Sequence, residues 1–598
     1  MSSLDRKYRS NADEAQMMLL GLVVIVGLPL AVYVVLSVGH AIQALSPAPA
    51  SGVIERLWGL FSGDTEWRGI ETALAVALAV MVAVAAWPFL RARRARSKSR
   101  VRHDRAAVHM ASGADMQAYG RKSTEAKAKK LGADSNEPGV FVGKMVRTGA
   151  AVFASFEDTL LHIWGPRTGK TTSQAAPSII EAPGPVVATS NKRDLLDWTR
   201  HARSGVGDVF VFDPQGIAEE PPRFWWNPLG YVTDGQRAAE MAENFMLGSR
   251  DLDSKGGDAF FDSAGKDLLA ALLLAAAVGN RPITRVHYWL TRPKDEEPLE
   301  LLDEAGWHGE ADGLSGVMNS PDKQREGVYG TARQAAACLK NPAIVPWVDP
   351  PKEGEDRPEF VPADFVRGRH TLYALSKEGA GTMGPLITSL TIAVTTAAEE
   401  YATSQGGRLS RPMLAVLDEA ANICRWANLP NLYSHYGSRG IVLSTFLQSY
   451  PQGESVWGEK GMKKLWSAAN IVTYGGNVKD GAFLKDMSAN LIGSYRYVAI
   501  SRSRGTGKNA GSTSRQDSTD EILSAADLQS LPPGRAVVFA SGCPAVLVRT
   551  VPIFERDYAD SLTAPAPAVL AAEPADDEPA AQPVADAPVN RWRTRLDA

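Results

Sequence analysis

The chain has 598 residues, 44% of them hydrophobic and 22% charged, and a formal net charge of −3. This length exceeds what one hydrophobic core supports, so we predict two to four mostly globular domains. The near-zero net charge excludes a nucleic-acid surface spread over the whole protein and leaves room only for a local basic patch. Three cysteines without CxxC spacing exclude a disulfide framework and a cysteine-rich zinc site.

Two apolar segments near the N-terminus predict a membrane anchor in residues 1–106. Residues 17–38 carry no charge and residues 72–90 are rich in Ala and Val, and each segment approaches the roughly 20 residues of a membrane-spanning helix. Lys and Arg flank the pair, whereas the stretch between contains few, which predicts both ends inside and a short external loop. A cleaved signal peptide is the competing interpretation, although its apolar region normally has only about 7–15 residues.

From this pattern we expect a multi-pass protein of the bacterial inner (cytoplasmic) membrane. The lipid bilayer is then a partner, and the remainder of the chain lies in the cytoplasm. The basic run that follows the second segment sets this orientation, and it also suits anionic lipid headgroups.

A phosphate-binding loop is predicted between His162 and Thr172. A short apolar stretch precedes it and a helical pattern follows, and strand, glycine-containing turn and helix N-terminus together hold phosphates through backbone N–H groups. We predict that Lys170 contacts the β- and γ-phosphates and that the Thr171 hydroxyl binds Mg²⁺. The predicted nucleotide-binding residues are Gly165, Pro166, Arg167, Thr168, Gly169, Lys170, Thr171 and Thr172.

This loop departs from the G-x-x-x-x-G-K-[ST] pattern at its first position. Trp164 stands where the pattern has glycine, and a glycine follows one place later at Gly165. A chance Gly-Lys-Thr in a surface turn is the competing interpretation, and a partner motif further along the chain decides against it. Trp164 itself has no explanation at the level of sequence.

Apolar strands alternate with helical stretches on both sides of a helical region. Residues 186–190 and 209–212 are examples of such strands, and this alternation predicts an α/β fold with a parallel sheet covered on both faces. Residues 235–346 show helical patterns and few strands, which predicts an inserted all-α domain. Residues 501–520, rich in Ser, Arg, Gly and Thr, predict a mobile loop whose arginines contact DNA phosphates or are simply solvated.

The partner motif follows the apolar strand at residues 413–417. Asp418 and Glu419 end this strand, and the carboxyl ends of buried parallel strands lie at the crevice where α/β proteins bind ligands. We predict that Asp418 holds Mg²⁺ as the Walker B carboxylate and that Glu419 polarises the attacking water. Two carboxylates that simply open a helix are the competing interpretation.

Two further residues complete the predicted catalytic set. Gln448 ends the next apolar strand, where it senses the γ-phosphate or positions water, unless it is merely a strand-terminal hydrogen-bonding residue. Arg439 stands at the entrance to the same strand and is predicted to project into a neighbouring subunit's site, where an arginine stabilises transition-state charge. A solvated loop arginine is the alternative.

With these residues in hand, the chain resembles the TraG/TraD family of type IV coupling proteins, the ATPases of conjugation and type IV secretion. The resemblance rests on Gly-Pro-Arg-Thr-Gly-Lys-Thr-Thr, Pro-Gly-Pro-Val-Val, Phe-Asp-Pro, Trp-Asn-Pro-Leu, Leu-Asp-Glu-Ala-Ala-Asn-Ile, Ser-Arg-Gly-Ile and Leu-Gln-Ser, in that order. It implies a RecA-like nucleotide-binding domain, placed at residues 107–234 and 347–556, an all-α domain at 235–346, and a hexamer around a channel. Residues 557–598 are predicted to be a disordered, Ala/Pro-rich acidic tail.

The resemblance also implies a function, with ATP and Mg²⁺ as cofactors. We expect an ATP hydrolase that recruits and helps translocate relaxase-bound single-stranded DNA or a protein substrate through the components of a type IV secretion channel. A substrate receptor that uses nucleotide only to set its oligomeric state is the first alternative. A DNA translocase of the FtsK type is the second, and the helical insertion argues against it. Cargo and secretion system stay open.

Overall fold

The structure is a computed structural model that describes residues 28–43, 101–250, 258–379, 383–504 and 511–563, with short helical pieces between 58 and 87. Its described residues form a mixed sheet of 11 strands with helices on both faces. The strand order is β2-β1-β13-β12-β9-β3-β8-β7-β4-β6-β5. The predicted α/β class is therefore confirmed.

One part of this sheet is parallel and the other is antiparallel. The parallel part consists of β9 (Ile471–Tyr474), β3 (Leu160–Ile163), β8 (Ile441–Leu447), β7 (Met413–Leu417), β4 (Val186–Ser190), β6 (Thr371–Leu375) and β5 (Val209–Phe212). The antiparallel extension from β9 consists of β12 (Arg535–Ala540), β13 (Val546–Arg549), β1 (Val140–Met145) and β2 (Ala151–Ala154). The carboxyl ends of the parallel strands all lie at one edge, and the candidate site is found there.

The central strands are apolar throughout because both of their faces are buried. In β7 the side chains of Leu414 and Val416 join one core, whereas Met413, Ala415 and Leu417 join the other. Successive side chains of a strand point to opposite faces, so a strand between two helical layers needs an uninterrupted apolar run. This requirement explains why the β7 sequence shows no polar alternation.

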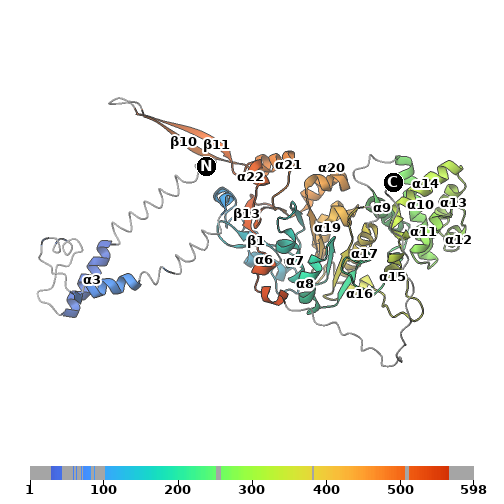
Figure 1. The fold of residues 1–598 in the computed structure, drawn as a ribbon, viewed down its shortest axis with the longest axis horizontal. Coiled ribbons are helices and arrows are strands. Elements are labelled where there is room, and N and C mark those ends of the chain that lie inside the picture. The colour runs from blue at the N-terminus through green and yellow to red at the C-terminus, as the bar shows by residue number, and fades with distance from the viewer. Residues whose placement is uncertain are drawn as a thin grey trace, which may run out of the picture.

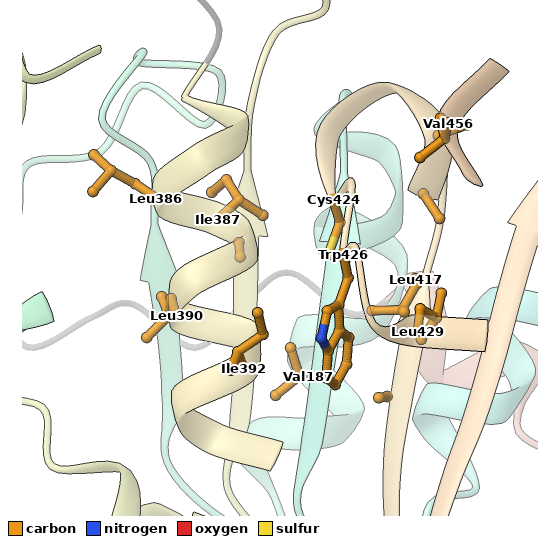
Figure 2. Packing of buried hydrophobic residues seen from close by; sticks show 14 of the residues in the cluster. Val187, Leu386, Ile387, Leu390, Ile392, Leu417, Cys424, Trp426, Leu429 and Val456 are labelled. Atoms are coloured by element: carbon orange, nitrogen blue, oxygen red, sulfur yellow. The ribbon is translucent and has the colours of Figure 1, made fainter. Parts of the chain in front are cut away.

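Helices cover the two faces of the parallel strands. One core takes in residues of α7 (Ala176–Ile180) and α8 (Asp194–Ser204), and the other takes in residues of α17 (Gly384–Ser404), α19 (Leu429–Tyr436) and α20 (Tyr450–Ala468). Helix α17 begins at a Gly-Pro pair, which suits the first helical turn because proline lacks an N–H. Figure 2 shows its Ile387, Leu390 and Ile392 in the same core as Trp426.

The described chain between β5 and β6 forms helices, and α10 to α14 gather at one end of the molecule, whereas α16 lies beside α17 (Figure 1). The helices of this stretch are α9 (Gly235–Ser249), α10 (Ala259–Val278), α11 (Thr284–Leu290), α12 (Glu297–Glu304), α13 (His308–Met318), α14 (Asp322–Ala335), α15 (Val345–Val348) and α16 (Pro362–Phe365). Helix α10 is the centre of this group, since α9, α12 and α14 all pack against it. The boundaries of the domains stay a prediction.

The remaining described elements are short, apart from one hairpin. They are α6 (Arg121–Lys130), α18 (Ala420–Ile423), α21 (Gly481–Asp486), α22 (Ala525–Gln529), the π-helical turns Thr171–Ala175 and Met487–Ile492, and the 3₁₀ turns Arg102–His109, Gln117–Tyr119, Pro228–Tyr231, Ala337–Lys340, Pro342–Ile344, Gly437–Arg439, Ile553–Glu555 and Ala559–Thr563. Residues 564–598 lie outside the described residues, and with them most of the predicted disordered tail.

The prediction of a mobile loop at residues 501–520 is wrong. Strands β10 (Ser494–Arg504) and β11 (Gly511–Glu521) pair antiparallel over their full length and project from the body of the molecule (Figure 1). Tyr495 stacks on His109 at the base of this hairpin, with ring centroids 3.9 Å apart. The Ser, Gly and Arg content suggested a loop, but the aromatic and β-branched residues at the start of β10 favour a strand.

The prediction of a multi-pass inner-membrane protein is also wrong for the part of the chain that the structure describes. No helix there is both long and apolar enough to span a bilayer. Helix α3 (Leu28–Gln43) overlaps the first predicted segment but has only 16 residues. Residues 17–27 of that segment lie outside the described residues.

Candidate nucleotide-binding site

The predicted phosphate-binding loop lies between β3 and a helical segment, at the carboxyl edge of the parallel strands. Arg167 and Gly169 adopt positive φ angles of 60° and 86°, which turn the chain tightly ahead of the helix. The Thr168 hydroxyl donates to the carbonyl of Gly165 at 2.7 Å, and the Ser173 amide donates to the carbonyl of Gly169 at 3.0 Å. These internal bonds hold the loop in a compact form.

Trp164 belongs to the core beneath this loop. Its indole is fully buried, and its Nε1 donates to Thr473 Oγ1 of the neighbouring strand β9 at 2.7 Å. A Cβ added at Gly475 would meet the indole at 2.1 Å, so only glycine fits opposite the ring. Gly165 is needed for a similar reason, because its Cβ would lie 2.1 Å from the carbonyl oxygen of Asn477. The glycine that the pattern lacks at 164 is thus replaced by a packing residue.

The predicted catalytic lysine meets the two predicted carboxylates. Lys170 Nζ lies 3.0 Å from Asp418 Oδ1 and is hydrogen-bonded to Glu419 Oε1. The strands that carry these groups, β3 and β7, are separated in the sheet by β8 alone. Glu419 has a positive φ of 53°, a strained conformation for a residue with a side chain, and such strain is concentrated at functional sites.

Burial and charge together set the ionisation of this cluster. Burial opposes the charged form of Lys170, but the carboxylates of Asp418 and Glu419 outweigh it and raise the pKa of the lysine. Burial raises the pKa of Asp418 above its ordinary value, although the lysine beside it acts in the opposite direction. One ammonium faces two carboxylates, so the cluster favours the addition of a cation.

Gln448 completes the predicted cluster from the end of β8. Its Nε2 donates to Glu419 Oε2 at 2.8 Å, so the amide and Lys170 hold different oxygens of the same carboxylate. Lys170, Asp418, Glu419 and Gln448 therefore lie together at the ends of three neighbouring strands. This grouping is what the sequence predicted, although the roles of the residues stay proposals.

Arg439 lies apart from this group, at the opposite edge of the sheet. It precedes β8, whereas Gln448 follows it, and seven strand residues place the two ends roughly 20 Å apart. Its guanidinium contacts Glu399 at 3.3 Å and donates to Thr403 Oγ1 at 2.6 Å, both on α17. Within one chain, the fold does not bring Arg439 to the phosphate-binding loop.

The other predicted loop residues have mainly local contacts. Pro166 accepts a hydrogen bond from Asn477 Nδ2 at 2.9 Å, and the Thr172 hydroxyl donates to Gly169 at 3.2 Å. Thr171 begins the π-helical turn that follows the loop, and its side chain is half-buried. Pro166 and Arg167 are exposed.

Sequence reasoning missed four polar residues beside the cluster: Asn191, Glu378, Asn422 and Gln452. Asn422 donates to Glu419 Oε2 at 3.2 Å and to Glu378 Oε1 at 2.9 Å. Gln452 donates to Asn422 Oδ1 at 2.8 Å, and Asn191 donates to Glu378. Two of these residues could have been found from their positions in the sequence. Asn191 and Glu378 follow the carboxyl ends of β4 and β6, as Asp418 follows β7.

The residues present suit magnesium bound together with phosphate. Among the described residues, no group of three or more His, Cys, Asp or Glu side chains is arranged to hold a metal ion by itself. Magnesium at phosphate sites normally takes one or two protein oxygens and shares phosphate oxygens. The Asp418 carboxylate and the Thr171 hydroxyl are oxygen donors of this kind, so the donor set fits.

Comparisons with known proteins agree with this geometry. The family model described as the TraM recognition site of TraD and TraG matches residues 412–533, a range that includes Asp418, Glu419 and Gln448. The type IV secretion system-coupling protein VirD4 of Bartonella quintana is 23% identical over 337 residues, which cover 53% of this chain and 50% of that protein. Protein VirD4 of Agrobacterium fabrum is 21% identical over 403 residues, which cover 66% and 58%.

A solved structure has the same fold. The bacterial conjugative coupling protein TrwBdeltaN70, in its unbound monoclinic form, superposes with a TM-score of 0.50 at 18% identity, covering 71% of this chain and 91% of that one. The chain spans about half the length of the curated relative from Bartonella quintana. The family match and the VirD4 relatives confirm the resemblance predicted from the motifs, the solved structure shows a shared fold, and this chain is similar to the type IV coupling proteins.

Proposed function

We propose that this protein is a coupling ATPase of a type IV secretion or conjugation system. It recruits relaxase-bound single-stranded DNA or a protein substrate and uses ATP hydrolysis to help translocate it. The observation that carries the proposal is the placement of Lys170 between Asp418 and Glu419, with Gln448 on the second oxygen of Glu419. The resemblance to VirD4 coupling proteins supplies the biological context.

Each residue of the site has a separate role in phosphoryl transfer to water. The backbone N–H groups of residues 167–172 and the helix N-terminus hold the phosphates, and Lys170 neutralises the β- and γ-phosphates. Thr171 and Asp418 would hold Mg²⁺, which would neutralise charge on the phosphate oxygens. Glu419 accepts the proton of the attacking water, and Gln448 orients the carboxylate of Glu419.

The contact between Lys170 and Glu419 links phosphate binding to the general base. Lys170 occupies Glu419 Oε1, so that oxygen does not orient a water molecule until the lysine moves to a phosphate. Nucleotide binding therefore releases the general base as part of the same movement that engages the phosphates. Hydrolysis then requires Lys170 at a phosphate and Glu419 Oε1 at the attacking water.

The role proposed for Arg439 depends on the assembly of several copies of the chain. We infer that copies of the chain form a ring, a hexamer by resemblance to the coupling proteins, and that Arg439 of one subunit faces the phosphates bound to its neighbour. Its position at the opposite edge of the sheet from Lys170 supports this inference, because one chain cannot supply both groups to one site. An arginine in this role stabilises charge that develops on the transferred phosphoryl group.

Substitution of Lys170 tests the proposal. Lys170→Ala should abolish DNA-stimulated ATP hydrolysis and substrate transfer between cells, since the phosphates lose their principal cation. Lys463→Ala, which removes an exposed lysine paired with Glu459 on α20, should leave both activities unchanged. Normal transfer by Lys170→Ala would rule out the motor. Lost transfer without DNA- or cargo-stimulated turnover in the wild type would instead favour a nucleotide-regulated substrate receptor.

A further inference from the structure

Every hydrogen-bonding group of the Asn422 side chain has a partner beside the cluster. It lies in α18, three residues after Glu419. Its Nδ2 donates to Glu419 Oε2 at 3.2 Å and to Glu378 Oε1 at 2.9 Å. Its Oδ1 accepts from Gln452 Nε2 at 2.8 Å. A side-chain amide has two N–H donors and one oxygen, and here each has a partner.

These partners fix the orientation of the amide. Rotating Asn422 by half a turn would place its oxygen against the carboxylates of Glu378 and Glu419 and its NH₂ against another NH₂. Gln452 is held in turn, because its Oε1 accepts the Gln448 backbone amide at 2.9 Å. Glu378 also accepts a hydrogen bond from Asn191, at the end of β4. The orientation of Asn422 is therefore set by groups from several different elements.

The two oxygens of Glu419 have different partners. Lys170 contacts Oε1, whereas the amides of Gln448 and Asn422 both donate to Oε2. Under the proposed function, Lys170 leaves Oε1 when it binds a phosphate, and Oε1 then receives the water. The hydrogen bonds that these two side-chain amides donate to Oε2 prevent the carboxylate from rotating at that moment.

We propose that Asn422 is a positioning residue for ATP hydrolysis, and that Glu378 and Gln452 act through it by fixing its amide. This proposal rests on the ATPase function proposed above. It predicts a specific kinetic signature, because Asn422 touches Glu419 and makes none of the described contacts with the phosphate-binding loop. Loss of the amide should slow the chemical step and leave nucleotide binding intact.

The first experiment measures ATP turnover and the binding of a non-hydrolysable ATP analogue. Asn422→Ala should lower kcat by about tenfold or more, since small misplacements of a catalytic group have effects of this size. The Kd for the analogue should stay within about twofold of the wild type, which also reports that the variant is folded. Asn422→Asp keeps the size but adds a carboxylate beside those of Glu378 and Glu419, so it should be at least as slow.

A matched control and a double-variant cycle separate positioning from a general structural effect. Asn319→Ala removes an exposed amide whose described side-chain bonds go only to Ser315 of the preceding helix α13, and it should have wild-type kcat. Glu378→Ala should lower kcat in the wild-type background and have no further effect in Asn422→Ala, because Glu378 acts through Asn422.

Either of two results would overturn the proposal: wild-type kcat in Asn422→Ala, or equal effects of Glu378→Ala in both backgrounds. Failure of the ATPase function itself is distinguishable, because the wild-type protein would then show no turnover that depends on Lys170. In that case no wild-type rate exists with which Asn422→Ala can be compared, and the proposed ATPase function itself is rejected.

Discussion

The indole of Trp164 lies directly against Gly475, so closely that a Cβ on the glycine would come within 2.1 Å of the ring. This contact joins the phosphate-binding loop to strand β9, and the hydrogen bond from Trp164 Nε1 to Thr473 strengthens the same junction. The backbone amide of Gly165 donates to the carbonyl of Gly476 at 3.0 Å. The first half of the loop is therefore built on β9 and the turn that follows it.

Gly475→Ala should disturb this junction. The added methyl group collides with a buried ring that has no free space, so we expect the free energy of unfolding to fall by about 1–3 kcal/mol. Nucleotide binding should weaken as well, because the loop shifts with the ring. Gly481→Ala is the control, since a Cβ there meets nothing within 4 Å. Denaturant unfolding and titration with an ATP analogue measure both effects, and equal behaviour of the two variants would contradict this account.

The burial of His162 predicts that the free energy of unfolding depends on pH. It is fully buried, with Nδ1 2.7 Å from Thr473 Oγ1 and Nε2 3.1 Å from Ser444 Oγ. Burial lowers its pKa from 6.5 to about 3, so the fold favours the neutral ring. This contribution to stability is complete above pH 6.5 and is lost progressively as the pH falls towards 3, by up to about 1.4 kcal/mol per pH unit.

His162→Gln removes the titrating group while it keeps polar atoms for the same partners. Between pH 6.5 and 5 the wild type should lose up to about 2 kcal/mol more stability than this variant. Unfolding by denaturant at several pH values measures the difference. Parallel curves for the two proteins would show that His162 does not titrate in the unfolding reaction.

Lys170 should also matter for stability, separately from catalysis. Lys170→Met leaves Asp418 and Glu419 buried beside each other without a cation, and breaking a buried ion pair on one side costs about 3–5 kcal/mol. The double variant Lys170→Met/Glu419→Gln should recover part of this loss, because one of the two carboxylates is then neutral. Chemical unfolding of the nucleotide-free protein tests this, and strictly additive effects would argue against direct coupling.

Arg439 can be tested by mixing two inactive proteins. Lys170→Ala lacks the phosphate lysine but keeps Arg439, whereas Arg439→Ala has the opposite defect. In a mixed ring about a quarter of the subunit interfaces combine the intact lysine of one with the intact arginine of the other. ATPase activity should therefore reappear on mixing. A mixture as inactive as its components would place Arg439 in a purely local role with Glu399 and Thr403.

Much of the parallel sheet could be predicted from sequence because its strands are short apolar runs that end in polar residues. β3, β4, β7 and β8 were found in this way, and the polar residues after them led to Asp418, Glu419 and Gln448. Strand β9 was missed, although its four residues are apolar or β-branched and follow a long helix. Its omission is the reason that Trp164 had no partner at the level of sequence.

The membrane prediction failed for a different reason. The prediction was based on apolar composition over residues 17–38, whereas the part of this segment that the structure describes is helix α3 (Leu28–Gln43), which ends among polar residues, and no described helix is long and apolar enough to span a bilayer. Composition measures how apolar a segment is, but the length of a helix depends on where it begins and ends. The hairpin of β10 and β11 shows the same limit, since pairing between strands outweighed a loop-like composition.

The sequence by itself determined which residues belong to the candidate site, because Lys170, Thr171, Asp418 and Glu419 stand in short local patterns that follow predicted strands. Only the tertiary structure decided which groups surround them. Glu378, Asn422 and Gln452 come from separate elements and meet because parallel strands bring their carboxyl ends to one edge. The same geometry places Arg439 at the other edge, a separation that follows from the direction of β8, and the structure shows that Arg439 contacts Glu399 and Thr403 there.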